Sequence, residues 1–261
     1  MDDIKNRLGL WCSIGISENK FLSKMASDMK KPLGITELWK SDIKDKLWPL
    51  PVRAMYGIGS KTSEKLNSMG INTIGELAKF DRNYLIKVFG KYAFDLHQQA
   101  NGEDSSRVQT HSSDVKSIGR STTLPEDIAD INKLKIILME LAEDVGMKAR
   151  EQAKKGTTIQ ITLKYASFQS VTRQTTVAPT YSTKTIYQTG YELLRRNFSS
   201  NRPIRLIGIS LSGFEEAAIH EQISIFEETQ NNKHEKIDEV MDRTRKKHGF
   251  EKINRGSLIK K

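Results

Sequence analysis

The pattern of hydrophobic and polar positions along the chain changes three times. The first stretch combines one short apolar run with one amphipathic helix pattern, and the second is helical throughout, with glycines between its helices. The third alternates strand and helix patterns, and the last is a charged tail with one predicted helix. We therefore expect a multidomain α+β protein divided into residues 1–40, 41–107, 108–214 and 215–261.

The first stretch begins with a strand and a helix. The apolar run from Leu10 to Ile16 has the length of a buried strand. Ser17 and Asn19 are residue types that cap helices, and the apolar positions that follow, up to Met29, recur at helical spacing. A strand and a helix with no preceding partner strand leave apolar faces that this stretch does not cover.

The strand and helix patterns over residues 108–214 predict one small α+β domain. Residues 159–165 alternate apolar and polar side chains, as a half-buried strand does, and three further segments also have strand patterns. Helix patterns over 131–153 and 183–198 separate them. We expect a four-stranded antiparallel sheet with both helices on one face.

Composition narrows the class of partner. The chain has 42 Lys and Arg against 32 Asp and Glu, and residues 108–214 alone carry 15 against nine, which favours a polyanion such as nucleic acid. The single cysteine, Cys12, excludes an internal disulfide, and the five histidines are too scattered for a four-ligand zinc site. No apolar run reaches the roughly 18–20 residues of a membrane helix. We expect a cytoplasmic protein with no membrane partner.

A glycine-rich segment between two predicted helices is the first candidate site. Gly57 and Gly59 lie just before a helix, where missing Cβ atoms let backbone N–H groups approach a phosphate. Lys61 and Lys65 are one helical turn apart and would flank that phosphate. This pattern predicts DNA-backbone binding by a helix-hairpin-helix, and the alternative is an ordinary glycine-rich turn.

Two other groups of basic residues are candidates for phosphate binding. Lys31 ends a lysine-rich helix whose ammonium groups would hold a triphosphate, unless they are a solvated helix face. In the α+β domain, Lys116, Arg120 and Lys164 accompany polar strand residues. They predict a sheet surface that binds DNA phosphates, and the alternative is a normal solvated sheet face.

The tail contains a short segment typical of docking peptides, Gln222-Ile223-Ser224-Ile225-Phe226. Exposed Ile225 and Phe226 would fill an apolar pocket on a partner, while Gln222 supplies directional hydrogen bonds. The alternative is that the segment packs on the chain's own body.

Taken together, these segments resemble the Y-family translesion DNA polymerases of the bacterial SOS type. CSIGISENKFLSKMASDMKKPLG resembles the end of the family's palm, PVRAMYGIGSKTSEKLNSMGINTIGELAKF its helix-hairpin-helix thumb, and VKSIGRSTTL onward its little finger. The resemblance implies a residual palm segment over 1–40, an all-helical thumb over 41–107 and a little finger over 108–214.

The resemblance also implies roles for individual residues. Lys31 matches the lysine that contacts the phosphates of the incoming nucleotide, with Leu33 nearby where the family usually has Asn. Gly57 and Gly59 match the hairpin that holds the primer-template backbone. Lys116 and Arg120 lie on the first little-finger strand, which grips DNA. Residues 222–226 resemble the peptide, including Ser224, that binds the sliding clamp.

The family joins nucleotides with Mg²⁺ held by palm carboxylates that lie before the stretch matched here. Asp2 and Asp3 do not fit those positions. The resemblance therefore implies a C-terminal portion, without most of the palm and the fingers, and with no catalytic residue, metal ligand or cofactor of its own. We expect it to bind primer-template DNA and the sliding clamp and not to polymerise alone.

Two alternatives remain open. In the first, a separately encoded N-terminal polymerase fragment completes the palm, which gives a split active polymerase. In the second, the chain is a non-catalytic adaptor that recruits or blocks partners at the clamp.

Overall fold

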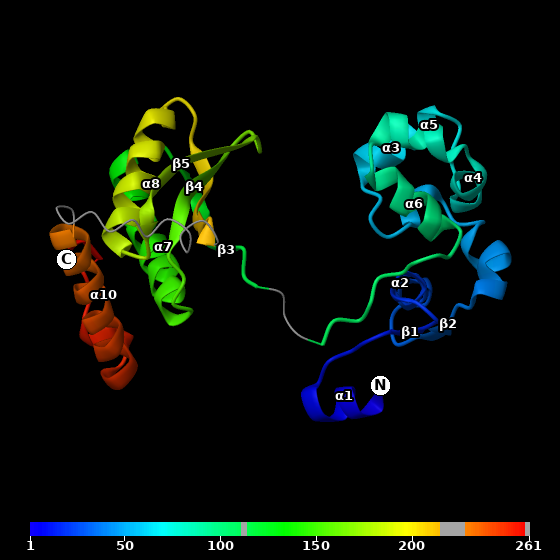
Figure 1. Ribbon diagram of the computed structural model, residues 1–261, viewed down its shortest axis with the longest axis horizontal. Helices are drawn as coiled ribbons and strands as arrows, with labels where there is room; N and C mark the ends of the chain where they lie inside the picture. The colour runs from blue at the N-terminus through cyan, green and yellow to red at the C-terminus, as the bar shows by residue number, and fades with distance from the viewer. Residues whose placement is uncertain (111–113, 215–227, 259–261) are drawn as a thin grey trace. The chain divides into compact units, whose positions relative to one another are not determined.

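The computed structural model describes residues 1–110, 114–214 and 228–258 (Figure 1). The chain forms two compact units, Met1–Ser112 and Ser113–Lys261. The expected α+β class is confirmed, because the first unit is mainly helical and the second contains a four-stranded sheet. The division between the units lies close to the pattern change at residue 108.

The first unit starts with two short strands joined through a helix. Its elements are α1 (Asp2–Leu8), β1 (Ile14–Ile16), α2 (Lys20–Met29) and β2 (Ile35–Glu37), with β1 and β2 parallel. The Asn19 side chain caps α2 by accepting a hydrogen bond of 2.8 Å from the Leu22 N–H. The predicted strand was too long, because β2 offers three partner residues. Leu10 and Trp11 are instead 60% and 66% exposed.

The rest of the first unit is helical. It begins with three short elements, which are the 3-10 turn η1 (Lys40–Asp42), the π-turn η2 (Ile43–Leu47) and the 3-10 turn η3 (Val52–Ala54). Four α-helices follow them: α3 (Ser60–Ser68), α4 (Ile74–Lys79), α5 (Arg82–Phe89) and α6 (Tyr92–Ala100). Thr73 and Glu76 form a capping box at the start of α4. One hydrophobic core extends from Phe21 to Ala100, so the strand–helix segment and the helices that follow it pack as a single body.

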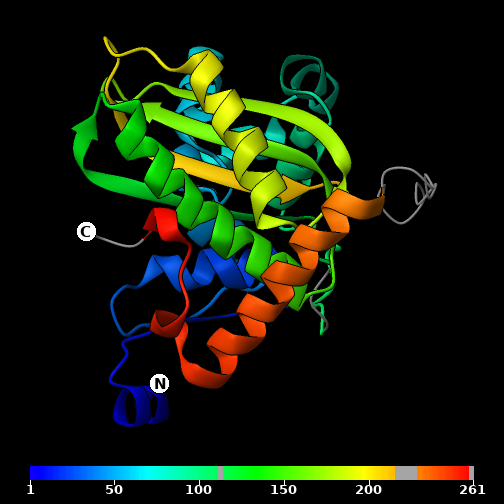
Figure 2. The ribbon, with the colours of Figure 1, turned by 90° about the vertical axis from the view of Figure 1, so that its left-hand side faces the viewer.

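The second unit is a sheet covered on one face by two helices, as expected. Its strand order is β3-β6-β4-β5, and all neighbours are antiparallel. Figure 2 shows the two helices lying side by side across the sheet. Pro125 lies in the edge strand, where a residue without an N–H is tolerated. The bounds are β3 (Ser117–Ile128), α7 (Ile131–Glu151), β4 (Gly156–Tyr165), β5 (Ser170–Thr180), α8 (Thr183–Asn197) and β6 (Ile204–Ser212).

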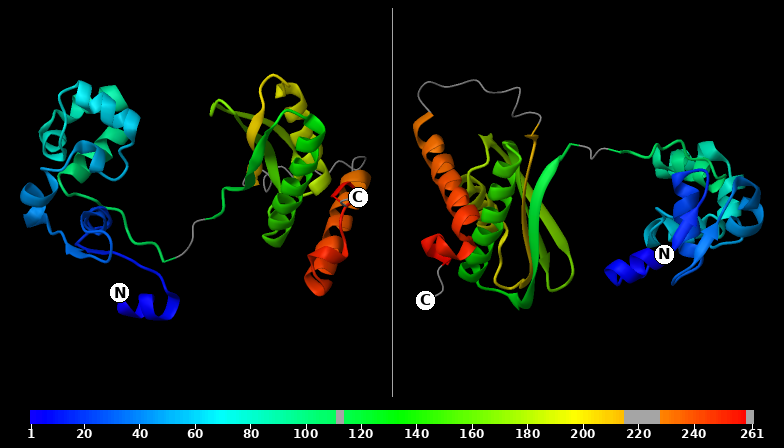
Figure 3. Two further views of the ribbon diagram at one scale, coloured as in Figure 1. Left: turned by 180° about the vertical axis from the view of Figure 1, so that it is seen from behind. Right: turned by 90° about the horizontal axis from the view of Figure 1, so that it is seen from below.

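A third helix, α10 (Glu228–His248), packs on the side of α7 that faces away from the sheet (Figure 3). Two short turns, η4 (Phe250–Lys252) and η5 (Gly256–Leu258), follow it. The predicted helix over 234–248 is therefore confirmed and is longer than expected. Within the described ranges, none of the helices combines the length and the apolar character needed to cross a membrane.

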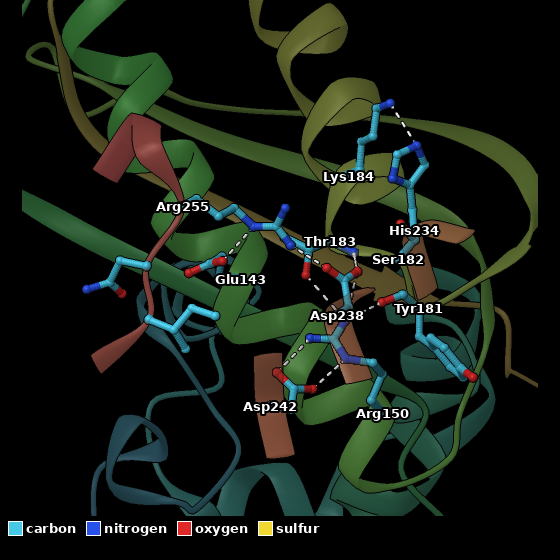
Figure 4. A network of polar contacts seen from close by, with 12 residues as sticks. Glu143, Arg150, Tyr181, Ser182, Thr183, Lys184, His234, Asp238, Asp242 and Arg255 are labelled. Carbon is cyan, nitrogen blue, oxygen red and sulfur yellow. Dashed lines mark hydrogen bonds and ion pairs between the residues drawn. The ribbon is translucent and has the colours of Figure 1, made fainter. Parts of the chain in front are cut away.

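Charged side chains hold α10 in place (Figure 4). The Arg150 guanidinium of α7 contacts Asp242 at 2.6 Å and Asp238 at 3.4 Å. The Arg150 and Asp238 side chains are 7% and 2% exposed, so this pair is shielded from water. Asp238 also accepts a hydrogen bond of 2.8 Å from the Thr183 N–H. Four further ion pairs among the described residues are Arg245 and Arg255 with Glu143, Arg255 with Asp238, and Lys155 with Glu235.

Candidate nucleic-acid interface

The glycine-rich loop before α3 has the geometry of an anion site. Gly57 has a φ of 94°, a conformation that L-residues rarely adopt. Gly59 is the N-cap residue of α3, and among the described residues no side chain caps this helix start. A Cβ built on Gly59 would meet none of the described atoms within 4 Å. The first N–H groups of α3 therefore lack a side-chain acceptor among the described residues, and the open Cβ position of Gly59 leaves room for an anion near them.

Three contacts hold this loop in position. The Tyr92 hydroxyl of α6 donates a hydrogen bond of 2.6 Å to the Gly57 carbonyl oxygen. The Tyr56 N–H donates to the Met25 sulfur at 3.3 Å, and the Ile58 side chain is buried in the core. Burial, followed by the nearby Asp95 carboxylate, raises the pKa of Tyr92, which extends to higher pH the range in which its hydroxyl is a donor.

The two lysines predicted to flank the phosphate differ in their contacts. Lys61 and Lys65 are both exposed on α3. The Lys65 ammonium donates to the Val88 carbonyl oxygen at 3.1 Å and lies 4.9 Å from the centre of the Phe89 ring. The Lys61 ammonium has no hydrogen bond or ion pair with any described residue. Lys61 therefore offers the more available charge at the helix start.

Lys31 follows α2 and is paired with a carboxylate. Its ammonium lies 2.5 Å from Asp28, which also contacts Lys24. Hydrogen bonds from Lys24 and then Lys31 hold the pKa of Asp28 below its usual range. The structure thus gives Lys31 a carboxylate neighbour that the sequence pattern did not indicate. Leu33 has a φ of 60°, a conformation that asparagine tolerates better than leucine.

The described residues contain no group of three or more His, Cys, Asp and Glu side chains placed to hold a metal ion. Asp2 and Asp3 lie in the first turn of α1 and are exposed. A divalent cation needs several carboxylates that converge on one point. Asp28, which contacts two lysines, does not form such a set within the described residues, and neither do Asp2 and Asp3.

The sheet face turned away from α7 and α8 is polar. Register pairs place Lys164 of β4 on this face together with small hydroxyl and amide side chains from all four strands. These are Ser117, Ser121 and Thr123 of β3, Thr158, Gln160 and Thr162 of β4, Thr172, Gln174 and Thr176 of β5, and Ser210 and Ser212 of β6. Leu206 of β6 shares this face, and the hydroxyl, amide and ammonium groups around it can approach a phosphate backbone.

Arg120 does not share this face with Lys164, so that part of the expectation is wrong. Arg120 pairs with Ile209, a buried residue of the helix-covered side, and its guanidinium lies 3.6 Å from Asp144 of α7. The alternation along β3 sends Ile118 and Arg120 to the same side, while Ser117 and Ser121 point to the other. Lys116 precedes β3 and is exposed.

The structure also gathers cations that the sequence reading missed. The Arg202 guanidinium lies 3.8 Å from the centre of the Tyr165 ring, and Arg205 lies 4.4 Å from that of Phe168. Lys164 lies 4.8 Å from the same Phe168 ring. The two arginines of the segment Arg202-Pro-Ile-Arg205, where strand β6 begins, were the available signal. Gln222 to Phe226, the predicted clamp-binding segment, lies outside the described residues.

The first unit contains the glycine-rich segment of a helix-hairpin-helix, and the second unit is an α+β domain. Together they define the class of protein. Two family models match these parts. The IMS family HHH motif matches residues 40–71, and the impB/mucB/samB family C-terminal domain matches residues 115–225.

Relatives and a solved structure agree with this class. DNA polymerase IV of Alkaliphilus oremlandii is 54% identical over 99% of the chain, and that of Clostridium kluyveri is 57% identical over 100%. The chain covers 67% of each relative's length. A Y-family DNA polymerase chimera shares the fold, with a TM-score of 0.66 and 24% identity, over 82% of this chain and 61% of its own. The chain belongs to the Y-family of DNA polymerases, among relatives that are called DNA polymerase IV.

Proposed function

We propose that this chain is the DNA-binding part of a translesion DNA polymerase that acts in SOS-type damage tolerance in the cytoplasm. The observation that carries the proposal is the start of α3, where the Cβ position of Gly59 is open and the Lys61 ammonium has no partner within the described part of the chain. The match of this segment to a helix-hairpin-helix model and the names of the relatives support it.

The proposed contacts go to the phosphate backbone of primer-template DNA. Gly57, Gly59, Lys61 and Lys65 bind it from the first unit. Lys164, with Lys116 and Arg120, binds it from the second, where Lys164 lies on the polar sheet face. Because phosphates are the same at every step, binding should show little sequence preference and should weaken steeply as salt rises.

The test compares two double variants in equilibrium binding to a labelled primer-template duplex. Lys61→Glu with Lys65→Glu should weaken binding on all sequences alike and lower the slope of log affinity against log salt. Lys246→Glu with Lys247→Glu, two exposed residues of α10, makes the same change in net charge and should have a smaller effect. Equal losses in both variants, or a loss confined to one DNA sequence, would refute the hairpin as the contact.

We propose further that the chain does not extend a primer alone. Polymerisation of this kind needs carboxylates that hold two Mg²⁺ ions, and the described residues provide no such group. Lys31 would contact the nucleotide's phosphates once those carboxylates are supplied. Incorporation of dNTPs by the pure chain with Mg²⁺ would contradict this. In the split-polymerase alternative, activity appears on adding a fragment that carries the metal-binding palm.

The segment Gln222 to Phe226 is proposed to bind the sliding clamp through Gln222, Ser224, Ile225 and Phe226. Its support is the sequence pattern and its position at the end of the little-finger match. Gln222→Ala with Phe226→Ala should abolish clamp binding and leave DNA affinity unchanged. If clamp binding persists in this variant, the assignment fails. A non-catalytic adaptor would depend on this segment alone, with a phenotype in cells that lack any palm fragment.

A further inference from the structure

An aromatic side chain stands at the tip of the hairpin between β4 and β5. Phe168 is 62% exposed and has a φ of 64°, a conformation in which glycine and asparagine are favoured. Two hydrogen bonds of 2.9 Å close the turn, from the Phe168 N–H to the Tyr165 oxygen and from the Tyr165 N–H to the Gln169 oxygen. Since glycine would form this turn without strain, the turn itself does not explain the phenyl ring.

Positive charges lie beside this ring in a fixed arrangement. The Lys164 ammonium lies 4.8 Å and the Arg205 guanidinium 4.4 Å from the ring centre. Two hydrogen bonds of 2.9 Å to Asp127 fix the orientation of Arg205 and hold the pKa of Asp127 below its usual range. With both cations in place, Phe168 is still an exposed residue. Ring and charges are therefore ordered before any ligand binds.

Further cations extend the charged surface. Arg202 stacks on Tyr165 at 3.8 Å and donates a hydrogen bond of 3.1 Å to the Gln169 side chain. Arg173 donates to the Asn197 side chain at 3.0 Å. Lys164, Arg202 and Arg205 thus lie around the hairpin tip with the Asp127 carboxylate, while Arg173 has the parity of the helix-covered face. The excess of positive charge favours a polyanion.

We propose that this cluster binds an unpaired segment of DNA, with a base stacked on Phe168 and the adjacent phosphates held by Lys164 and Arg202. An exposed ring flanked by cations is the combination that single-stranded nucleic acid uses. Inside a duplex the neighbouring bases cover both faces of each base, so a free face is available only in unpaired nucleotides. The inference rests on the proposed DNA binding. It adds a stacking contact to a base, which does not depend on the base sequence, to the proposed contacts with phosphates.

Phe168→Gly tests the role of the ring, because glycine suits the φ of this residue and the hairpin should keep its fold. The probes are an oligothymidine, an abasic strand of equal length and a blunt duplex. Phe250→Ala, which removes another exposed phenyl ring of the same unit, is the matched control. Thermal unfolding of both variants verifies the fold.

The wild-type chain should bind oligothymidine more tightly than the abasic strand. Phe168→Gly should remove that preference, with a loss between about fivefold and a hundredfold on oligothymidine. Duplex and abasic affinities should stay within about twofold, and Phe168→Trp should restore binding. Unchanged oligothymidine affinity in Phe168→Gly, or equal losses on all three probes, would overturn the stacking role. Duplex binding by the wild type, measured in the same experiment, separates this failure from failure of the proposed DNA binding.

Discussion

The Tyr92 hydroxyl donates a hydrogen bond of 2.6 Å to the Gly57 carbonyl oxygen and so ties α6 to the glycine-rich loop before α3. In the last turn of α3, the Lys65 ammonium contacts the Val88 carbonyl oxygen and the Phe89 ring at the end of α5. The loop before α3 and the last turn of α3 are thus each held by residues that follow them in the sequence by more than 20 positions. We infer that the loop is ordered before DNA arrives, which lowers the entropic cost of binding.

Tyr92→Phe should loosen the loop without removing the ring. The loss of one hydrogen bond should lower the free energy of unfolding by roughly 1 kcal/mol and weaken duplex binding severalfold. Urea unfolding and duplex titration measure the two effects. A variant with full DNA affinity would show that this hydrogen bond contributes to folding alone.

Gly57 and Gly59 should respond differently to the same substitution. Gly57→Ala forces alanine into a positive φ and places its Cβ 2.9 Å from the Tyr92 hydroxyl oxygen, so we expect a loss of about 1–2 kcal/mol or more in stability. Gly59 has a φ of −86° and open space around its Cβ position. Gly59→Ala should therefore keep stability and still weaken DNA binding, because the methyl group stands where a phosphate approaches. Equal stability losses in the two variants would contradict this assignment of strain.

The ion network under α10 should matter more than exposed ion pairs. Arg150→Leu removes the guanidinium that Asp242 and the buried Asp238 share, while Asp238 keeps Arg255. Breaking a buried pair costs about 3–5 kcal/mol, and we expect a loss near the lower end because Arg255 remains. Arg196→Leu, which removes an exposed pair with Glu192 on α8, should cost less than about 1 kcal/mol. Hydrogen exchange should show α10 losing protection in the first variant and keeping it in the second. Equal protection in both would mean that Met241 and the remaining contacts suffice to dock the helix.

The sequence predicted the elements whose signals are local. The strand alternation of β4, the Asn19 cap of α2 and the apolar stripes of α7 and α8 are all set by neighbouring residues. The strand from Leu10 was predicted too long because its length depends on the three partner residues of β2, which no local pattern reveals.

The site was predictable where it rests on backbone conformation and less so where it rests on tertiary contacts. Glycine at position 57 permits the positive φ that the loop adopts there, and the missing Cβ atoms of Gly57 and Gly59 were read directly from the sequence. Arg120 was placed on the wrong face of the sheet. Which alternate residues of β3 face the helices depends on their contact with α7, and the polar residues on both faces of β3 hide this alternation in the sequence. The ring contacts of Phe168 join residues of β4, β6 and a turn, so periodicity gives no sign of them.

Lys164 and Arg120 should therefore contribute unequally to DNA binding. Lys164→Ala removes a charge from the polar sheet face, while Arg120→Ala removes one from the helix-covered side, where Asp144 already offsets it. We expect the larger affinity loss and the larger reduction in salt slope from Lys164→Ala. Duplex titrations at several salt concentrations measure both. A larger effect of Arg120→Ala would mean that the edge of β3, and not the sheet face, approaches the DNA.

The docking of α10 should also depend on pH through Tyr181. Burial, followed by the hydrogen bond of 3.0 Å that the hydroxyl donates to Glu239 and the charge of Glu235, raises the pKa of Tyr181 to about 12. The folded state therefore holds the phenolic proton more tightly than the unfolded state, whose tyrosine pKa is about 10. This contribution to stability is complete below pH of about 10 and is lost as the pH rises toward about 12. Tyr181→Phe has no such proton, so its urea midpoint should fall less than that of the wild type across this interval, while lysine titration affects both alike. If the urea midpoints of the two proteins fall by the same amount as the pH rises, the hydroxyl ionises as freely in the folded chain as in the unfolded one.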